Sequence, residues 1–235
     1  MSAPIERTIY DKEGLWVNPC GGTRNPDYDS TEQSYHDYND PKILDPFNPI
    51  VVLCNNSLTH AKLFRDQYVK KTFEQDFAKQ LEMWSFQSVH YDWLPSEEQL
   101  PKSLGQPTSP EHLDSLKIND VLLDTYEYLQ KIAVGLEQVV WDLNKNGGEF
   151  IQNFQDAESF LRGVLCEIHM AIFDRRITQR PDVTRDIMSL DMRELSTTHR
   201  KLRDWVIFRD YMNCLEYVRE VFEYFNKNPS KLGSS

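Results

Sequence analysis

The chain has 235 residues, which is enough for one domain and marginal for two. A hydrophobic share of 40% fits a folded globular protein, and only 9 glycines argue against an all-β sandwich or a glycine-rich nucleotide-binding fold. The net charge of −11 argues against a nucleic-acid partner, because the phosphate backbone would repel the protein. No apolar run approaches the roughly 20 residues that span a bilayer, so we expect no membrane insertion.

Residues 1–52 are predicted to form a mostly irregular N-terminal extension, because they are rich in Pro, Asp, Asn and Tyr and show no periodicity. We expect this extension to dock through Trp16, Tyr28 and Phe47. The apolar run at 50–53 either leads into the first helix or forms a short extended piece. Residues 1–10 lack the apolar core of a signal peptide, which leaves the cytosol, an unusual export route or a missing leader open.

The first helix is expected to begin near Asn56 or Ser57 and to carry an apolar stripe that reaches Trp84 at steps of three or four residues. Several prolines exclude a continuous helix over the following crossover, at about 85–111. Within it, the sequence at 96–99 resembles a capping box and predicts a single helical turn. The large aromatic residues of this stretch predict that the crossover is pinned onto the helices.

The second helix has the clearest pattern, with a leucine at every seventh residue. Pro110 after Ser109 predicts its first turn, and Gly147 with Gly148 predicts its end. The third helix is expected at about 149–174, where Gly163 is interpreted as allowing a close approach by a neighbour. The leucines of the second helix are Leu122, Leu129, Leu136 and Leu143.

A second crossover is predicted at about 175–198, and the fourth helix is predicted to begin near Thr197 or Thr198 and to stop at Asn228-Pro229. Residues 229–235 are interpreted as a disordered tail. The connections are thus long, short and long. Because a short link forces antiparallel neighbours and a long link lets two helices run the same way, residues 53–228 are predicted to form an all-α, up-up-down-down four-helix bundle.

No catalytic constellation is found. The 6 histidines are scattered, and the Glu-x-x-His pairs of a di-iron bundle are missing. Cys166 and His169 are spaced to face one another on a helix, but a nucleophile in a bundle core has no substrate pocket. We therefore expect no enzyme activity, no cofactor and no metal.

The chain has four cysteines, which allow three disulfide pairings. The alternative is that Cys166 and Cys214, each inside an apolar helical stripe, are buried thiols. Asn55 begins a glycosylation sequon and is a candidate site if the chain is secreted. The cysteines are Cys20, Cys54, Cys166 and Cys214.

The segment 201–211, KLRDWVIFRDY, resembles the start of the last helix in the interleukin-6 superfamily. The likeness is to the ciliary neurotrophic factor and cardiotrophin-like branch, with an invertebrate Unpaired-type relative as the alternative. Lys201 falls on the lysine of a Phe-x-x-Lys motif, while Thr198 replaces the phenylalanine. The second helix, from Leu122 to Leu143, is similar in character to the second helix of that branch.

This resemblance implies a secreted, extracellular cytokine or growth factor that is monomeric before it binds. Such ligands cluster cell-surface cytokine receptor chains and thereby activate Janus kinase/STAT signalling. The candidate receptor-binding residues are Thr198, Lys201 and Trp205, although core packing is an equally good role for Trp205. The alternative function is an intracellular, all-helical protein-interaction module.

The first half of the fourth helix is basic within an acidic chain. This predicts either a surface for an acidic partner or a salt-bridged face involving Asp204, Asp210 and Glu216. The basic residues are Arg200, Lys201, Arg203 and Arg209.

Overall fold

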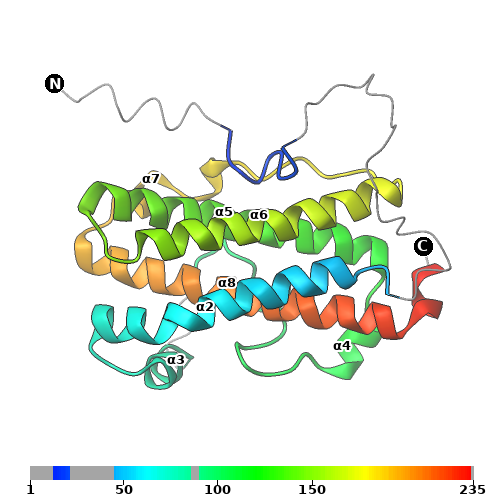
Figure 1. Cartoon of the computed structure of the whole chain (residues 1–235), viewed down its shortest axis with the longest axis horizontal. Helices are drawn as coiled ribbons and strands as arrows, with labels where there is room; N and C mark the ends of the chain where they lie inside the picture. The colour runs from blue at the N-terminus through cyan, green and yellow to red at the C-terminus, as the bar shows by residue number, and fades with distance from the viewer. Residues whose placement is uncertain (1–12, 22–44, 86–89, 234–235) are drawn as a thin grey trace.

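The computed structural model describes residues 13–21, 45–85 and 90–233 (Figure 1). All regular structure in these ranges is helical, which confirms the predicted all-α class. The helices are α2 (Asn48–Phe73), α3 (Phe77–Ser85), α4 (Pro110–Ser115), α5 (Ile118–Asn146), α6 (Ile151–Asp174), α7 (Leu190–Arg193) and α8 (Thr197–Lys227), with 3-10 turns η1 (Arg185–Ile187) and η2 (Pro229–Gly233). None of the helices in the described ranges has the length and apolar character needed to cross a membrane.

The long helices α2, α5, α6 and α8 pack side by side, with α2 and α5 each contacting both α6 and α8. Hydrogen bonds join their ends, and in each of these pairs a residue at the start of one helix contacts a residue at the end of the other. These contacts are Phe47 N to Asn226 Oδ1 (3.0 Å) for α2 and α8, Lys71 to Glu149 for α2 and α6, Arg175 Nε to Asn119 Oδ1 (3.2 Å) for α5 and α6, and Arg203 Nη2 to Asp142 Oδ2 (2.5 Å) for α5 and α8.

An aromatic cluster forms the centre of the core where α2, α6 and α8 meet. The Phe64 ring lies 4.9 Å from that of Phe208, measured between centroids, and Phe154 meets Phe208 edge-on at 5.3 Å. Tyr68 adds a further edge-on contact to Phe154 at 5.4 Å. Offset and edge-on pairs of this kind contribute about 0.5–1.5 kcal/mol beyond their buried area, so this cluster fixes the helix positions as well as burying surface.

The helix α2 begins earlier than predicted. Its first residue is Asn48 rather than Asn56 or Ser57, so the expected boundary at residue 52 falls inside the helix. Pro49 occupies its first turn, where a missing N–H costs nothing, and Ile50 is completely buried. The apolar run at 50–53 therefore belongs to the helix.

The predicted continuous helix up to Trp84 is also wrong, because α2 ends at Phe73 and α3 starts at Phe77. Glu74 adopts a left-handed conformation (φ 58°) and caps α2. This turn lets Phe73 and Phe77 both meet the ring of Trp205 edge-on, at 6.2 and 5.8 Å. The tertiary contact with Trp205 explains why the stripe continues in sequence although the helix does not.

Capping residues explain where several elements begin and end. Ser109 caps the short helix α4 by accepting a hydrogen bond from His112 N at 3.2 Å, with Pro110 in the first turn. The prediction that these two residues begin the second helix is wrong, because the backbone is extended at Leu116 and Lys117 and α5 starts at Ile118. Gly147, at φ 68°, ends α5 as expected. The capping box also forms, since Ser96 N donates to Gln99 Oε1 at 3.0 Å and Gln99 N donates to Ser96 Oγ at 3.4 Å.

The segment 13–21 lies against α5 and α6, as expected for Trp16. The Trp16 indole is buried and donates to Val183 O at 2.7 Å, while Phe47 is buried at the start of α2. Cys20 and Cys166 form a disulfide, whereas Cys54 and Cys214 are buried thiols. Tyr28 lies outside the described residues.

The tail is ordered further than predicted. Residues Pro229–Gly233 form η2, and Arg175 Nη2 donates to Leu232 O at 2.9 Å. Lys231 Nζ donates to Asp114 O at 2.7 Å. The interpretation of 229–233 as a disordered tail is therefore wrong, because these residues have partners on α4 and at the end of α6; residues 234–235 lie outside the described part of the chain.

Candidate functional sites on α8

The N-terminal tip of α8 carries the predicted receptor-binding residues. Thr198 and Lys201 are exposed, and their spacing of three residues places them on one side of the helix. Trp205 is completely buried, with 0% of its surface accessible. Of the two roles left open for Trp205, core packing is the one compatible with this burial, so the accessible part of the tip consists of Thr198 and Lys201 without an aromatic anchor.

A buried ion cluster holds this tip in place. Arg203 is completely buried and donates to Asp142 Oδ2 at 2.5 Å and to Asp204 Oδ1 at 2.6 Å. It also donates to Met192 O at 2.8 Å, which joins α8 to the segment at the end of α7. Burial raises the pKa of Asp204 to about 6, and the positive charge of Arg203 opposes that rise. The cluster thus links the end of α5, α7 and the start of α8.

The basic first half of α8 is only partly a surface feature. Arg203 is internal, and Arg209 Nε donates to Asp210 Oδ1 at 2.7 Å. The expected salt-bridged arrangement with Asp204 and Asp210 is confirmed for these two arginines. Lys201 remains as an exposed cation near the helix start.

The first crossover, residues 74–117 between α2 and α5, is held against one side of α8 by hydrogen bonds and ion pairs. Glu220 Oε2 accepts from Thr108 N at 2.8 Å and from Thr108 Oγ1 at 2.7 Å. Glu216 Oε2 accepts from Gly105 N and from Lys102 Nζ, both at 2.8 Å. Further contacts are Asn213 Nδ2 to Lys102 O (3.0 Å), His112 Nε2 to Tyr217 OH (2.9 Å) and Tyr224 OH to Asp114 Oδ1 (2.6 Å).

These contacts between the first crossover and α8 were not predicted from the sequence. Glu216 was interpreted as part of a salt-bridged surface and Glu220 was not singled out, since the partners of both lie more than a hundred residues away in the chain. The recurrence of polar side chains at steps of three and four along one side of α8 was the available signal. That pattern is also typical of a solvated helix face, so it does not identify a docked segment by itself.

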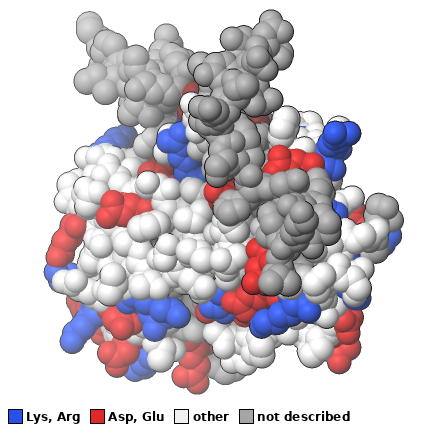
Figure 2. All heavy atoms as spheres, turned by 45° about the vertical axis from the view of Figure 1, so that its right-hand side comes forward, with Lys and Arg blue, Asp and Glu red and all other residues white. Residues whose placement is uncertain are grey.

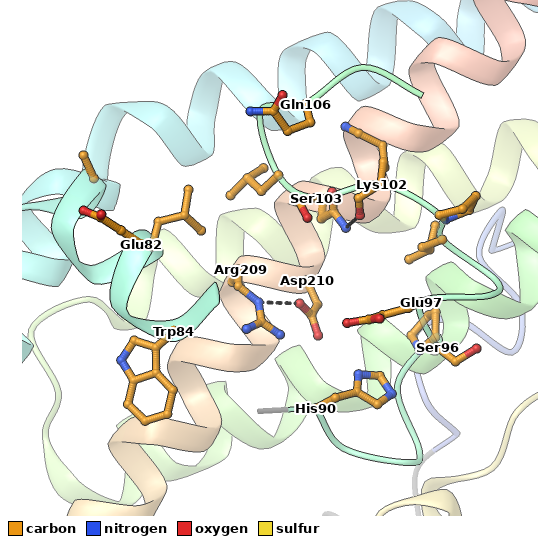
Figure 3. Close-up of a pocket in the computed structure, with 17 residues that line it drawn as sticks. Glu82, Trp84, His90, Ser96, Glu97, Lys102, Ser103, Gln106, Arg209 and Asp210 are labelled. Atoms are coloured by element: carbon orange, nitrogen blue, oxygen red, sulfur yellow. Dashed lines mark hydrogen bonds and ion pairs between the residues drawn. The ribbon is translucent and has the colours of Figure 1, made fainter. Parts of the chain in front are cut away.

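A cavity of about 660 Å³, here called the crossover cavity, lies between α3, residues 90–106 of the first crossover and α8 (Figure 3). Its apolar lining includes Leu81, Trp84, Leu100 and Leu104. Arg209 and Asp210 project from α8 into its centre. The volume falls within the usual range of ligand pockets, about 300–1,000 Å³.

The candidate glycosylation residue Asn55 is exposed on α2. Ser57, the third sequon residue, is buried and its Oγ donates to Leu53 O at 2.7 Å. A glycan would have to be added before the chain folds, since the serine faces inward afterwards.

The surface in Figure 2 shows acidic and basic side chains interspersed around a broad uncharged area.

Within the described ranges, no group of three or more His, Cys, Asp or Glu side chains is placed to hold a metal ion. Cys166 is bonded to Cys20, so it has no free thiol that could act as a nucleophile with His169.

No protein-family model matches this chain, and neither does any curated protein or solved structure.

Proposed function

We propose that this protein is an up-up-down-down four-helix bundle that acts as a secreted, cytokine-like ligand of cell-surface receptors. The observation that carries the bundle assignment is the set of end-to-end contacts among α2, α5, α6 and α8. They support an arrangement in which α2 and α5 run in one direction and α6 and α8 run in the other. Long connections at 74–117 and 175–196 and a short one at 147–150 support the same order.

The tip of α8 is the proposed receptor contact. Lys201 and Thr198 are accessible there, and the buried cluster around Arg203 limits their movement. A contact surface that is already ordered loses little conformational entropy on binding. The resemblance to the interleukin-6 superfamily supplies the remainder of the proposal: one ligand clusters receptor chains, and the associated Janus kinases then activate STAT proteins.

Secretion is supported by the disulfide between Cys20 and Cys166, since such bonds persist in oxidising compartments. The alternative, an intracellular interaction module, makes the opposite prediction for these two cysteines. Mass analysis under non-reducing conditions of protein purified from its native source decides between them. A Cys20–Cys166 cross-linked peptide supports secretion, and two free thiols at these positions support the intracellular alternative.

The receptor role is tested on cells that display receptor chains of the interleukin-6 receptor class. We expect the protein to bind these cells and to raise STAT phosphorylation, and Lys201→Glu to reduce both. Lys227→Glu is the matched control, because Lys227 is an exposed lysine at the opposite end of the same helix. Equal activity of the wild type and Lys201→Glu would remove the tip from the receptor contact, and no binding by the wild type would contradict the receptor role itself.

A further inference from the structure

The lysine and the arginine that line the crossover cavity are already paired with carboxylates. Lys102 has a fully buried side chain and pairs with Glu216 at 2.8 Å and with Glu220 at 3.4 Å. Arg209 pairs with Asp210. Neither cation is therefore available for an anionic ligand without breaking an ion pair inside the protein.

Several hydrogen-bond acceptors of the cavity, by contrast, have unused capacity. Figure 3 shows the carboxylate of Glu97 directed toward Asp210, whose second oxygen points away from Arg209. Glu97 has no ion pair within the described part of the chain, and Asp210 is 9% exposed. Asn213 also lines the cavity, and its buried Oδ1 has no hydrogen-bond partner among the described residues.

Burial raises the pKa of Asp210, and the nearby charges of Arg209 and His90 oppose this effect. A second cation beside this carboxylate would offset the cost of burying it further. The indole Nε1 of Trp84 is an unpartnered donor as well, but Figure 3 shows it on the side of the ring remote from Arg209. The carboxylates of Glu97 and Asp210 thus make the centre of the cavity acidic, with His90 beside them.

We propose that the crossover cavity binds an arginine side chain of a protein partner. The aliphatic part of that side chain would lie against Leu81 and Leu100, and its guanidinium would lie between Glu97 and Asp210. Arginine fits better than lysine because its planar head presents five N–H donors in a fixed fork, which can pair with two carboxylates at once.

The test uses the complete, isotope-labelled chain and two small probes in a nuclear magnetic resonance titration. Nα-acetyl-arginine methylamide is the ligand, and the citrulline analogue is its control, because citrulline has nearly the same shape without the charge. We expect saturable shifts of amide signals at 96–106 and 209–213 with the arginine probe. We expect the affinity for the citrulline probe to be about fivefold lower than that for the arginine probe, which is in the range of a partly exposed ion pair.

A matched pair of variants locates the interaction. Glu97→Gln removes a cavity carboxylate, whereas Glu98→Gln removes the neighbouring exposed carboxylate, which does not line the cavity. Glu97→Gln is expected to weaken arginine binding several-fold and Glu98→Gln to leave it unchanged. Equal binding of both probes, equal effects of both variants, or shifts located elsewhere would overturn the inference. No receptor takes part in this experiment, so its outcome is separate from that of the proposed contact at the tip of α8.

Discussion

Cys20 is joined by a disulfide to Cys166, 146 residues further along the chain, and this bond ties the segment 13–21 to the middle of α6. The segment has additional contacts beside the bond. Gln130 Nε2 donates to Trp16 O at 3.3 Å, and Arg162 Nε donates to Pro19 O at 2.7 Å. The disulfide therefore reinforces a docked segment rather than holding a loose one.

Removing this disulfide is expected to lower the stability of the fold. Closing so long a loop restricts the unfolded chain, so Cys20→Ser with Cys166→Ser should reduce the free energy of unfolding by about 2–5 kcal/mol. Urea denaturation measures the difference. Reductant should destabilise the wild type by a similar amount and leave the double variant unchanged; equal sensitivity of both proteins to reductant would contradict the assignment.

Two glycines within helices should respond oppositely to alanine. A Cβ on Gly135 would lie 2.9 Å from Ile207 Cγ2 and 3.1 Å from the Trp93 ring, so these packed side chains would have to shift to accept it. A Cβ on Gly163 would meet Leu53 at 3.8 Å, which is an ordinary contact. The sequence-based expectation of a close approach at Gly163 is thus wrong, and the close approach occurs at Gly135.

We expect Gly135→Ala to destabilise the protein by about 1–2 kcal/mol, because overpacking outweighs the gain in helix propensity. Gly163→Ala should stabilise it by about 0.5–1 kcal/mol, since only the propensity changes. Thermal and urea denaturation of the two variants measure both effects. Stabilisation by both substitutions would show that Ile207 and Trp93 can move aside without cost.

Glu158 makes the stability depend on pH. Burial raises its pKa to about 8, and the charge of Glu137 adds to the rise. Because the ordinary value is 4.5, the folded protein binds this proton more tightly than the unfolded chain does. The resulting contribution to stability is present at low pH and is lost as the pH rises toward and through 8.

Replacing Glu158 with Gln should remove that loss. The free energy of unfolding of Glu158→Gln is expected to fall less steeply than that of the wild type between pH 5 and 8, by at most about 1.4 kcal/mol per pH unit. The exposed Glu98→Gln variant is the control and should keep the wild-type slope. Parallel curves for Glu158→Gln and the wild type would mean that Glu158 is ionised in the folded protein near neutral pH.

The sequence predicted the elements whose signals are local. The heptad leucines of α5, the glycine after it and the Asn228-Pro229 stop of α8 each act within a few residues, and each was located correctly. The start of α2 was missed because Asn56 and Ser57 are both good capping residues, whereas the true start is stabilised by burial of Phe47 and Ile50. Phe47 packs on Phe222, a residue far away in the chain.

The candidate sites were predictable to a smaller extent, because burial of single side chains depends on packing between helices. Trp205 and Lys201 belong to the same amphipathic pattern, yet one is internal and the other exposed. The crossover cavity depends on where a proline-containing segment lies on α8. Its position is set by side-chain pairs such as Thr108 with Glu220, which no periodicity encodes.

The cluster of Arg203 with Asp142 and Asp204 yields an asymmetric prediction. Arg203→Met removes the cation and leaves two carboxylates close together in a buried site, which should cost about 3–5 kcal/mol. Asp142→Asn keeps Arg203 paired with Asp204 and should cost clearly less. Urea denaturation at pH 7 measures both values.

The same pair of variants should separate in their response to pH. Arg203 lowers the pKa of Asp204, so its removal should raise that pKa further above its present value of about 6. Acidification from pH 7.5 to 5 neutralises the carboxylates and should therefore recover part of the stability lost in Arg203→Met. Asp142→Asn, which retains the arginine, should recover much less. Equal costs for the two variants at pH 7, with no recovery on acidification, would show that the cluster is hydrated and that the tip of α8 is held by packing around Trp205 alone.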